Sequence, residues 1–298
     1  MLVDLVQVSA ADGMRLHGAL ETPPADQTVD AVKPLVDAWL CIHGTGSNFY
    51  SASTLAGLVP KMLAGGAAVL RANTRGHDLV STGPTAAGRG LQGAAFERVD
   101  ESPLDLAAWI GLLRERGYQR IGLLGHSMGA IKAILTLAAD EPPEVAALVA
   151  ISPPHLSYSY YLETERAEEF RRTFALAAER IAAGKGDELM LIRFPLTYYV
   201  SAAGFVDRYG PDEKYNVLRL LPRVAVPTLV TYGSSEMQEI TFRGMSDAVE
   251  RLSTNRLAAA KNLRQVAIIA GADHIYSGVH DVLASRIERW LHRQARGA

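Results

Sequence analysis

One serine stands between two glycines where a strand-like segment meets a helix-like one. Residues 121–124 read IGLL, residues 125–129 read GHSMG, and residues 128–140 are rich in Ala, Leu and Ile. This pattern predicts a buried strand, a sharp turn centred on Ser127 and a helix. The flanking glycines let the strand and the helix approach closely, so the turn presents the serine side chain. Ser127 is therefore the candidate nucleophile.

A serine hydroxyl is a weak nucleophile at neutral pH and needs a base that removes its proton. Four histidines follow the serine in the chain: His155, His274, His280 and His292. We predict that His274 is the base, because it follows the apolar segment 265–269 in a loop that returns its imidazole to the end of the sheet. The other three remain alternatives, one at the start of an inserted segment and two in the last predicted helix.

The base in turn needs an acidic group that orients it and stabilises its charge. Residues 228–236 read TLVTYGSSE, which is a strand, a glycine turn and then Glu236. We predict Glu236 as this acid, since either type of carboxylate can orient a histidine. Three competitors remain open: Glu239, Asp247 and Asp273.

Acyl transfer also develops an oxyanion, which fixed backbone N–H groups stabilise by a few kcal/mol each. The amide of Met128 lies at the predicted helix start, and that of Thr45 lies in the glycine-rich turn HGTGSN, residues 43–48. We predict that these two amides form the oxyanion hole. His43 is expected to brace this turn by hydrogen bonds rather than to exchange protons, and His77 and His126 are interpreted in the same way.

The elements that must position these residues alternate between strand and helix. Two alternating apolar segments around a turn at residues 11–13 predict an opening hairpin, and the later pattern predicts strands at 36–42, 67–72, 120–124, 145–151, 228–232 and 265–269, with helices at 54–63, 102–116, 128–140, 246–252 and 279–293. This order predicts an α/β fold with a mostly parallel sheet, helices on both faces and sites at the carboxyl ends of the strands. Residues 73–99 are rich in glycine and predict a long surface loop.

The alternation is interrupted after the strand at 145–151. An aromatic stretch at residues 158–161 and a charged helical segment at 163–183 follow before it resumes. We therefore predict a core domain formed by residues 1–152 and 224–298, with an inserted cap at residues 153–223. The tyrosines of the cap are interpreted as packing it onto the core.

Composition narrows the class of protein. A chain of 298 residues with 48% hydrophobic content buries a substantial core without needing metal or disulfide. Cys41 is the only cysteine, which excludes an internal disulfide and a cysteine-based zinc site. The net charge of -2 offers no basic face to nucleic acid. Without a secretory signal or a membrane-spanning run, a cytoplasmic location without membrane partners is expected, and a homodimer stays open.

Five short motifs resemble those of the α/β-hydrolase superfamily: HGTG at 43–46, RGHD at 75–78, GHSMG at 125–129, GSSE at 233–236 and GADH at 271–274. The resemblance covers nearly the whole chain. It implies a cofactor-free enzyme with a Ser–His–acid triad, an eight-stranded sheet and a helical cap inserted after the sixth strand. The sequence departs from this pattern at Glu236, where aspartate is usual, and at Asp78, where members often have a small residue.

The expected function is hydrolysis of a small-molecule carboxylic ester through an acyl-enzyme, with Ser127 attacking, His274 moving the proton and Glu236 orienting the base. Two alternatives remain. The same residues could cleave a carbon–carbon bond in a ketonic substrate, or the chain could be a small-molecule receptor that signals through movement of its cap.

Overall fold

The computed structural model describes residues 3–24, 35–85, 88–139, 142, 144–254 and 264–297. Its centre is an eight-stranded sheet with the order β1-β2-β4-β3-β7-β8-β11-β12. The strands are β1 Val3–Ser9, β2 Arg15–Glu21, β3 Ala38–Ile42, β4 Ala68–Ala72, β7 Ile121–His126, β8 Val145–Ile151, β11 Thr228–Gly233 and β12 Arg264–Ile269. Strand β2 pairs antiparallel with β1 and β4, and every other pair in this sheet is parallel. The predicted opening hairpin and the mostly parallel sheet are confirmed.

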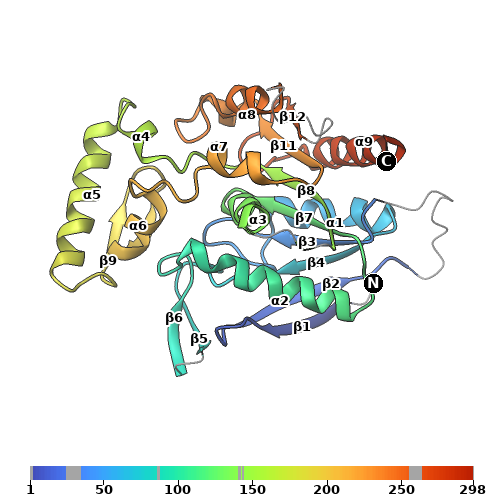
Figure 1. Cartoon of the computed structure of the whole chain (residues 1–298), viewed down its shortest axis with the longest axis horizontal. Coiled ribbons are helices and arrows are strands. Elements are labelled where there is room, and N and C mark those ends of the chain that lie inside the picture. The colour runs from blue at the N-terminus through green and yellow to red at the C-terminus, as the bar shows by residue number, and fades with distance from the viewer. Residues whose placement is uncertain are drawn as a thin grey trace.

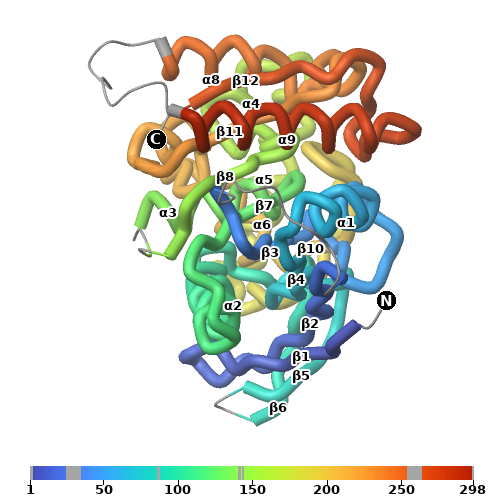
Figure 2. The backbone as a smooth tube through the Cα atoms, turned by 90° about the vertical axis from the view of Figure 1, so that its right-hand side faces the viewer, coloured from blue at the N-terminus to red at the C-terminus, as the bar shows by residue number. Residues whose placement is uncertain are grey.

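Helices cover both faces of the sheet (Figures 1 and 2). Helices α1 (Thr54–Ala64) and α9 (His280–Gly297) share one hydrophobic cluster, while α2 (Ser102–Glu115), α3 (Met128–Ala139) and α8 (Met245–Thr254) contribute to the other. Every residue of β7 is buried. A strand covered on both faces needs a continuous apolar run rather than alternation, which is why residues 121–124 are uniformly apolar.

The segment between β8 and β11 is mainly helical and projects to one side of the sheet, at the left of Figure 1. It contains α4 (Tyr158–Tyr161), α5 (Ala167–Ala182), the antiparallel strands β9 (Leu189–Ile192) and β10 (Tyr198–Ser201), α6 (Ala202–Tyr209) and α7 (Val217–Leu220). The ring of Tyr161 is fully buried and contacts those of Phe170 and Phe194. Its hydroxyl donates to the His155 carbonyl, so Tyr161 packs within the inserted segment. The hydroxyl of Tyr160 donates to the Ile240 carbonyl at 2.7 Å, and this tyrosine joins the segment to the part of the chain after β11, as expected.

The prediction of a surface loop at residues 73–99 is wrong in two respects. Residues Ser81–Thr85 and Gly88–Gln92 form an antiparallel hairpin, β5–β6, and both ends of the region are buried. Arg75 lies in the interior because its guanidinium binds the buried carboxylate of Asp105 on α2, with 2.7 Å between Nη2 and Oδ1. Burial of an arginine requires such a partner. The sequence pattern missed it because the two residues are 30 positions apart.

A second buried cluster of charges joins α3 to the inserted segment. The carboxylate of Glu97 lies between Lys132 of α3, with 2.5 Å between Nζ and Oε1, and Arg208 of α6, with 3.3 Å between Nη2 and Oε2. All three side chains are 0% exposed. Removing one partner from a buried ion cluster is strongly destabilising because it leaves an uncompensated charge in the interior. Glu97 therefore holds two cations that would otherwise be isolated in the interior.

Replacing Glu97 by glutamine is expected to lower the free energy of unfolding by about 3–5 kcal/mol, because Lys132 and Arg208 then lose the anion that they share. Urea unfolding followed by circular dichroism measures this change. The matched control is Glu165→Gln, which removes a surface partner of Arg243 and should leave the unfolding midpoint unchanged. Equal midpoints for both variants would contradict the stabilising role of Glu97.

Candidate active site

Ser127 occupies the turn between β7, which ends at His126, and α3, which begins at Met128. Its φ of 56° lies in the left-handed region that side chains rarely adopt. A Cβ at Gly125 would lie 2.3 Å from the carbonyl oxygen of Gly129, and only glycine allows this approach. The side chain of Ser127 is half-buried, so the predicted strand–turn–helix arrangement is confirmed.

Three residues distant in sequence form one hydrogen-bonded chain. The distance from Ser127 Oγ to His274 Nε2 is 3.1 Å, and that from His274 Nδ1 to Glu236 Oε2 is 2.8 Å. Because a carboxylate only accepts, Nδ1 carries the imidazole proton and Nε2 accepts from the serine hydroxyl. The structure thus brings together the three residues that the sequence singled out, in the geometry that proton removal from Ser127 requires.

Glu236 is fully buried at the start of a short 3-10 helix, Glu236–Gln238, directly after β11. Its second oxygen, Oε1, accepts from the Gly233 amide at 2.6 Å and from the Ser152 hydroxyl at 2.5 Å. Together with His274, three donors surround the carboxylate. These hydrogen bonds to a carboxylate hold the side chain in one orientation.

The imidazole of His274 lies between two other rings. Its centroid is 4.7 Å from that of His126 and 4.8 Å from that of Phe242. His126 Nε2 donates to the His274 carbonyl oxygen at 2.7 Å, and burial lowers the pKa of His126 to about 3, so this ring is neutral. Sequence reasoning missed Phe242, because nothing in its local pattern distinguishes it from other core residues.

The alternative bases and acids lie in other surroundings. His155 donates to the Arg243 carbonyl and stacks on Tyr160, while Asp273 accepts from the amides of Ile275 and Ser277. His280 donates to the Ile275 carbonyl. The remaining three are exposed: Glu239, Asp247 and His292. Within the described part of the chain, none of the six is hydrogen-bonded to Ser127 or to the His274 imidazole.

The turn that carries Thr45 lies against the serine. A Cβ at Gly44 would be 3.1 Å from the Cβ of Ser127, so this turn and the start of α3 face the same hydroxyl. Met128 is the first residue of α3, and its amide belongs to the helix-start donors that have no intrahelical acceptor. A helix start also favours negative charge. Thr45 thus follows a residue that lies against Ser127, and Met128 follows Ser127 itself.

His43 braces the same turn, as expected. Its Nδ1 donates to the Gly44 carbonyl at 2.8 Å, and its Nε2 accepts from the Thr74 amide at 3.0 Å. Both ring nitrogens are thus occupied. Burial, followed by the charge of Lys132, lowers the pKa of His43 to about 3. The ring is neutral and links the loop after β3 to the loop after β4.

Asp78 strengthens this link and explains its departure from the family pattern. Its backbone has a φ of 56°, and its carboxylate accepts from Asn48 at 2.6 Å, Tyr50 at 2.5 Å and His77 at 2.9 Å. Burial opposes ionisation of Asp78, but these hydrogen bonds outweigh it and lower its pKa. A small residue could not make these contacts. Asp78 therefore holds the glycine-rich turn and the loop after β4 together.

The two buried neutral histidines make stability depend on pH. In the unfolded chain His43 and His126 titrate near 6.5, and in the folded chain near 3. As pH falls below 6.5, the unfolded chain binds protons first, so the stabilisation present above 6.5 is lost progressively. We expect the free energy of unfolding to fall by up to about 1.4 kcal/mol per pH unit for each ring.

Urea unfolding at about pH 7 and about pH 5 tests this dependence in a range above the acidic titration of carboxylates such as Glu213, whose pKa is about 2. His43→Gln should have a smaller loss between the two pH values than the native chain. His292→Gln, which changes an exposed ring, should have the same loss as the native chain. An equal loss in all three proteins would rule out titration of His43 as a cause.

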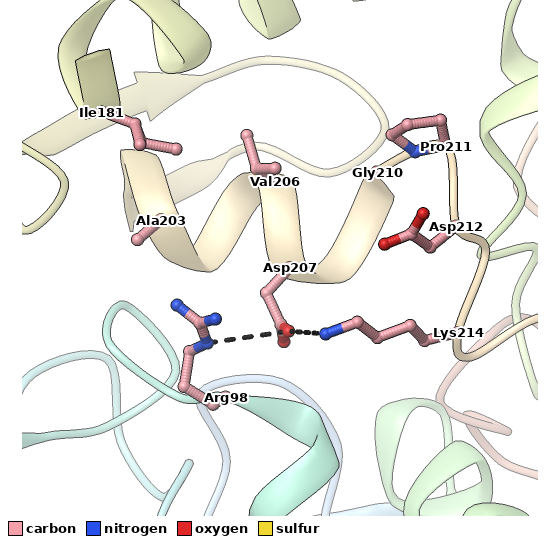
Figure 3. A pocket seen from close by; sticks show the side chains of 9 residues that line it. All are labelled: Arg98, Ile181, Ala203, Val206, Asp207, Gly210, Pro211, Asp212 and Lys214. Atoms are coloured by element: carbon pink, nitrogen blue, oxygen red, sulfur yellow. Dashed lines mark hydrogen bonds and ion pairs between the residues drawn. The ribbon is translucent and has the colours of Figure 1, made fainter.

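A pocket of about 230 Å³ lies beside α6 in the inserted segment (Figure 3). Arg98 and Lys214 reach into it, and both pair with Asp207, at 3.6 Å and 3.2 Å. None of Ser127, His274 or Glu236 lines this pocket. The side chains of Arg98 and Lys214 are already paired with a carboxylate of the protein. The pocket is therefore separate from the hydrogen-bonded chain that contains Ser127.

Cys41 is a buried free cysteine, and burial raises its pKa to about 12, which confirms its packing role. In the described ranges, no three side chains of His, Cys, Asp or Glu are grouped to hold a metal ion. Among the helices there, none is both long enough and apolar enough to cross a membrane.

The sequence matches the family model described as "Alpha/beta hydrolase family" over residues 39–294. The chain therefore belongs to the alpha/beta hydrolase family, in agreement with the resemblance that its motifs carry. No curated protein matches the sequence.

Solved structures of hydrolases are similar to this chain. Est1E from Butyrivibrio proteoclasticus, solved with ferulic acid bound, is 14% identical, with 97% of this chain and 99% of that chain covered and a TM-score of 0.64. The alpha/beta hydrolase GrgF from Penicillium sp. sh18 is 15% identical, with 98% and 99% covered and a TM-score of 0.68. The Pyrococcus furiosus esterase Pf2001 is 19% identical, with 98% and 91% covered and a TM-score of 0.62. At these identities the likeness establishes a shared fold.

Proposed function

We propose that this chain is a serine hydrolase that cleaves small-molecule carboxylic esters through an acyl-enzyme. The observation that carries the proposal is the hydrogen-bonded chain from Ser127 through His274 to Glu236. A serine on a strained turn, an imidazole aligned to accept its proton and a buried carboxylate behind that imidazole form the arrangement that activates a hydroxyl for acyl transfer. Membership of a hydrolase family supports the reaction class.

In the first half of the reaction, Ser127 Oγ attacks the ester carbonyl while His274 Nε2 takes its proton. The negative charge that develops on the carbonyl oxygen is stabilised by the amides of Thr45 and Met128. The resulting imidazolium is stabilised by Glu236 and gives its proton to the departing alcohol, which leaves the acyl group on Ser127.

In the second half, water replaces the alcohol. His274 removes a proton from the water as it attacks the acyl-enzyme, and the same two amides stabilise the second oxyanion. The carboxylic acid then leaves, and the serine hydroxyl regains its proton from His274. No proton remains on Glu236 at any step, since its role is to orient and stabilise the base.

A fluorophosphonate probe tests the proposal directly, because it modifies only activated serines. We expect intact-protein mass spectrometry to show one adduct and peptide mapping to place it on Ser127. His274→Gln should remain unlabelled although Ser127 is still present, since the proton acceptor is lost. An unlabelled native chain with an intact fold, or an adduct on another serine, would overturn the mechanism.

A substrate panel then separates the reaction classes. We expect turnover of p-nitrophenyl esters of short acyl chains that is greatly reduced in Ser127→Ala. A hydroxycinnamate ester belongs in the panel because the similar Est1E structure contains ferulic acid. A vinylogous diketone tests carbon–carbon cleavage. Turnover of the diketone without ester hydrolysis would replace the ester proposal, and stoichiometric binding without turnover would indicate a receptor.

A further inference from the structure

Behind Glu236, away from His274, three buried hydroxyl groups continue the hydrogen-bonded chain. Ser152 Oγ is 2.5 Å from Glu236 Oε1 and 3.0 Å from the hydroxyl of Tyr276, which is 3.0 Å from Thr231 Oγ1. All four side chains are 0% exposed. They come from four places in the fold: the end of β8, strand β11, the turn after β11 and the loop after β12.

Each hydroxyl has one proton to donate, and this fixes the direction of every hydrogen bond in the series. A carboxylate only accepts, so Ser152 donates its single hydroxyl proton to Glu236. Ser152 then accepts at its other contact, so Tyr276 donates to Ser152, and Thr231 donates to Tyr276 for the same reason. Burial, followed by the charge of Glu236, raises the pKa of Tyr276, so its phenol keeps the proton that this order requires.

The backbone conformation of two of these residues indicates that the surrounding structure holds them in place. Ser152 has a φ of 50° and Tyr276 a φ of 57°, both in the left-handed region. A residue as bulky as tyrosine rarely adopts it, and such strain persists only where the surrounding structure holds it in place. The nucleophile Ser127 shares this conformation, with a φ of 56°. Left-handed backbone therefore occurs on both sides of Glu236 along the hydrogen-bonded chain.

We propose that Thr231, Tyr276 and Ser152 form a hydroxyl relay that holds the carboxylate of Glu236 for His274, with Ser152 as the principal positioning residue. This inference rests on the proposed function and adds a set of residues that position its catalytic acid. Each hydroxyl polarises the next, so the donor at Ser152 is stronger than an isolated hydroxyl, and it leaves Oε2 free to face the imidazole.

The relay predicts a graded loss of turnover. Ser152→Ala should lower kcat by about 10- to 100-fold with KM unchanged, because a hydrogen bond to a buried charge is lost at a group that does not touch substrate. Tyr276→Phe keeps the Ser152 bond and should lower kcat by only a few-fold. The acidic limb of the pH profile should move to lower pH in Ser152→Ala, since a carboxylate that is no longer held toward His274 stabilises the imidazolium less.

The matched control is Ser157→Ala. Ser157 is also buried and donates to a carboxylate, that of Glu213 at 2.9 Å, in the inserted segment. Its loss removes the same kind of hydrogen bond without touching Glu236. Rates are expressed per serine titrated with the fluorophosphonate probe, so partial misfolding does not imitate a lower kcat. Ser157→Ala should retain native kcat and pH profile.

A second measurement does not need turnover. The His274 Nδ1 proton should give a low-field proton NMR resonance in the native chain, and this resonance should broaden through solvent exchange in Ser152→Ala but persist in Ser157→Ala. An unchanged resonance together with native kcat in Ser152→Ala would overturn the relay. A native chain without ester hydrolysis would instead refute the proposed function, while the resonance would still decide whether Ser152 positions Glu236.

Discussion

Ser127→Ala is expected to lower kcat/KM for a p-nitrophenyl ester by about 10⁵-fold or more, since the variant lacks the atom that forms the acyl-enzyme. Some rate above that in water should remain, because the amides of Thr45 and Met128 still stabilise charge on the carbonyl oxygen. Alanine tolerates the left-handed turn about as well as serine does, so the fold should be preserved. Initial rates over a range of substrate concentrations measure the loss.

Two comparisons make this result decisive. Urea unfolding should give the same midpoint for Ser127→Ala as for the native chain, which separates lost chemistry from lost structure. Ser159→Ala, a change of an exposed serine on α4, should keep native kcat/KM. If the Ser127 variant retains more than about one hundredth of the native rate, hydrolysis does not proceed through an acyl group on this serine.

Glu236→Gln should be the next most damaging change, with a loss in kcat of about 10³- to 10⁴-fold. The glutamine amide has one oxygen in place of two, while three donors converge on the native carboxylate from His274, Gly233 and Ser152. Its NH2 group therefore faces a donor, which disfavours the tautomer with the proton on Nδ1. The variant also loses the charge that stabilises the imidazolium.

Glu236→Asp tests whether the length of the side chain matters. Gly233 and Ser152 hold one carboxylate oxygen at 2.6 Å and 2.5 Å, so a side chain one methylene shorter cannot keep these contacts and reach His274 at the same time. We expect a loss of about 10- to 100-fold, smaller than for glutamine because the charge is retained. Glu239→Gln, at an exposed competitor, should leave kcat unchanged. A larger loss for Glu239→Gln than for Glu236→Gln would reverse the assignment of the acid.

Local sequence patterns were sufficient for the strands of the central sheet and for the turn at Ser127. The strand and helix on each side of this residue are specified by a short apolar run and two glycines, all within contact range along the chain. Chain order then limited the choice of base and acid to a few residues, because each had to follow a strand of a parallel sheet. His274 and Glu236 were selected in this way.

The sequence patterns did not predict the burial of polar residues whose partners are distant in the chain. Residues 73–99 have the composition of a surface loop, yet Glu97 is buried because Lys132 and Arg208 come to it from α3 and α6. Ser152 carried no signal as a positioning residue, since its hydroxyl meets Glu236 only after β8 and β11 pair. Desolvation forces such groups to find partners but does not say which ones.

The amino-acid sequence by itself therefore determined the α/β class, the turn that presents Ser127 and the short set of bases and acids, because each depends on backbone preferences and apolar periodicity over a few neighbouring residues. Only the tertiary structure decided that Glu236 rather than Glu239 or Asp273 meets the imidazole, that Phe242 and His126 enclose it, and that three hydroxyls support the carboxylate. These contacts depend on distances of a few ångströms between strand ends, and such distances are set when the sheet and its helices pack together.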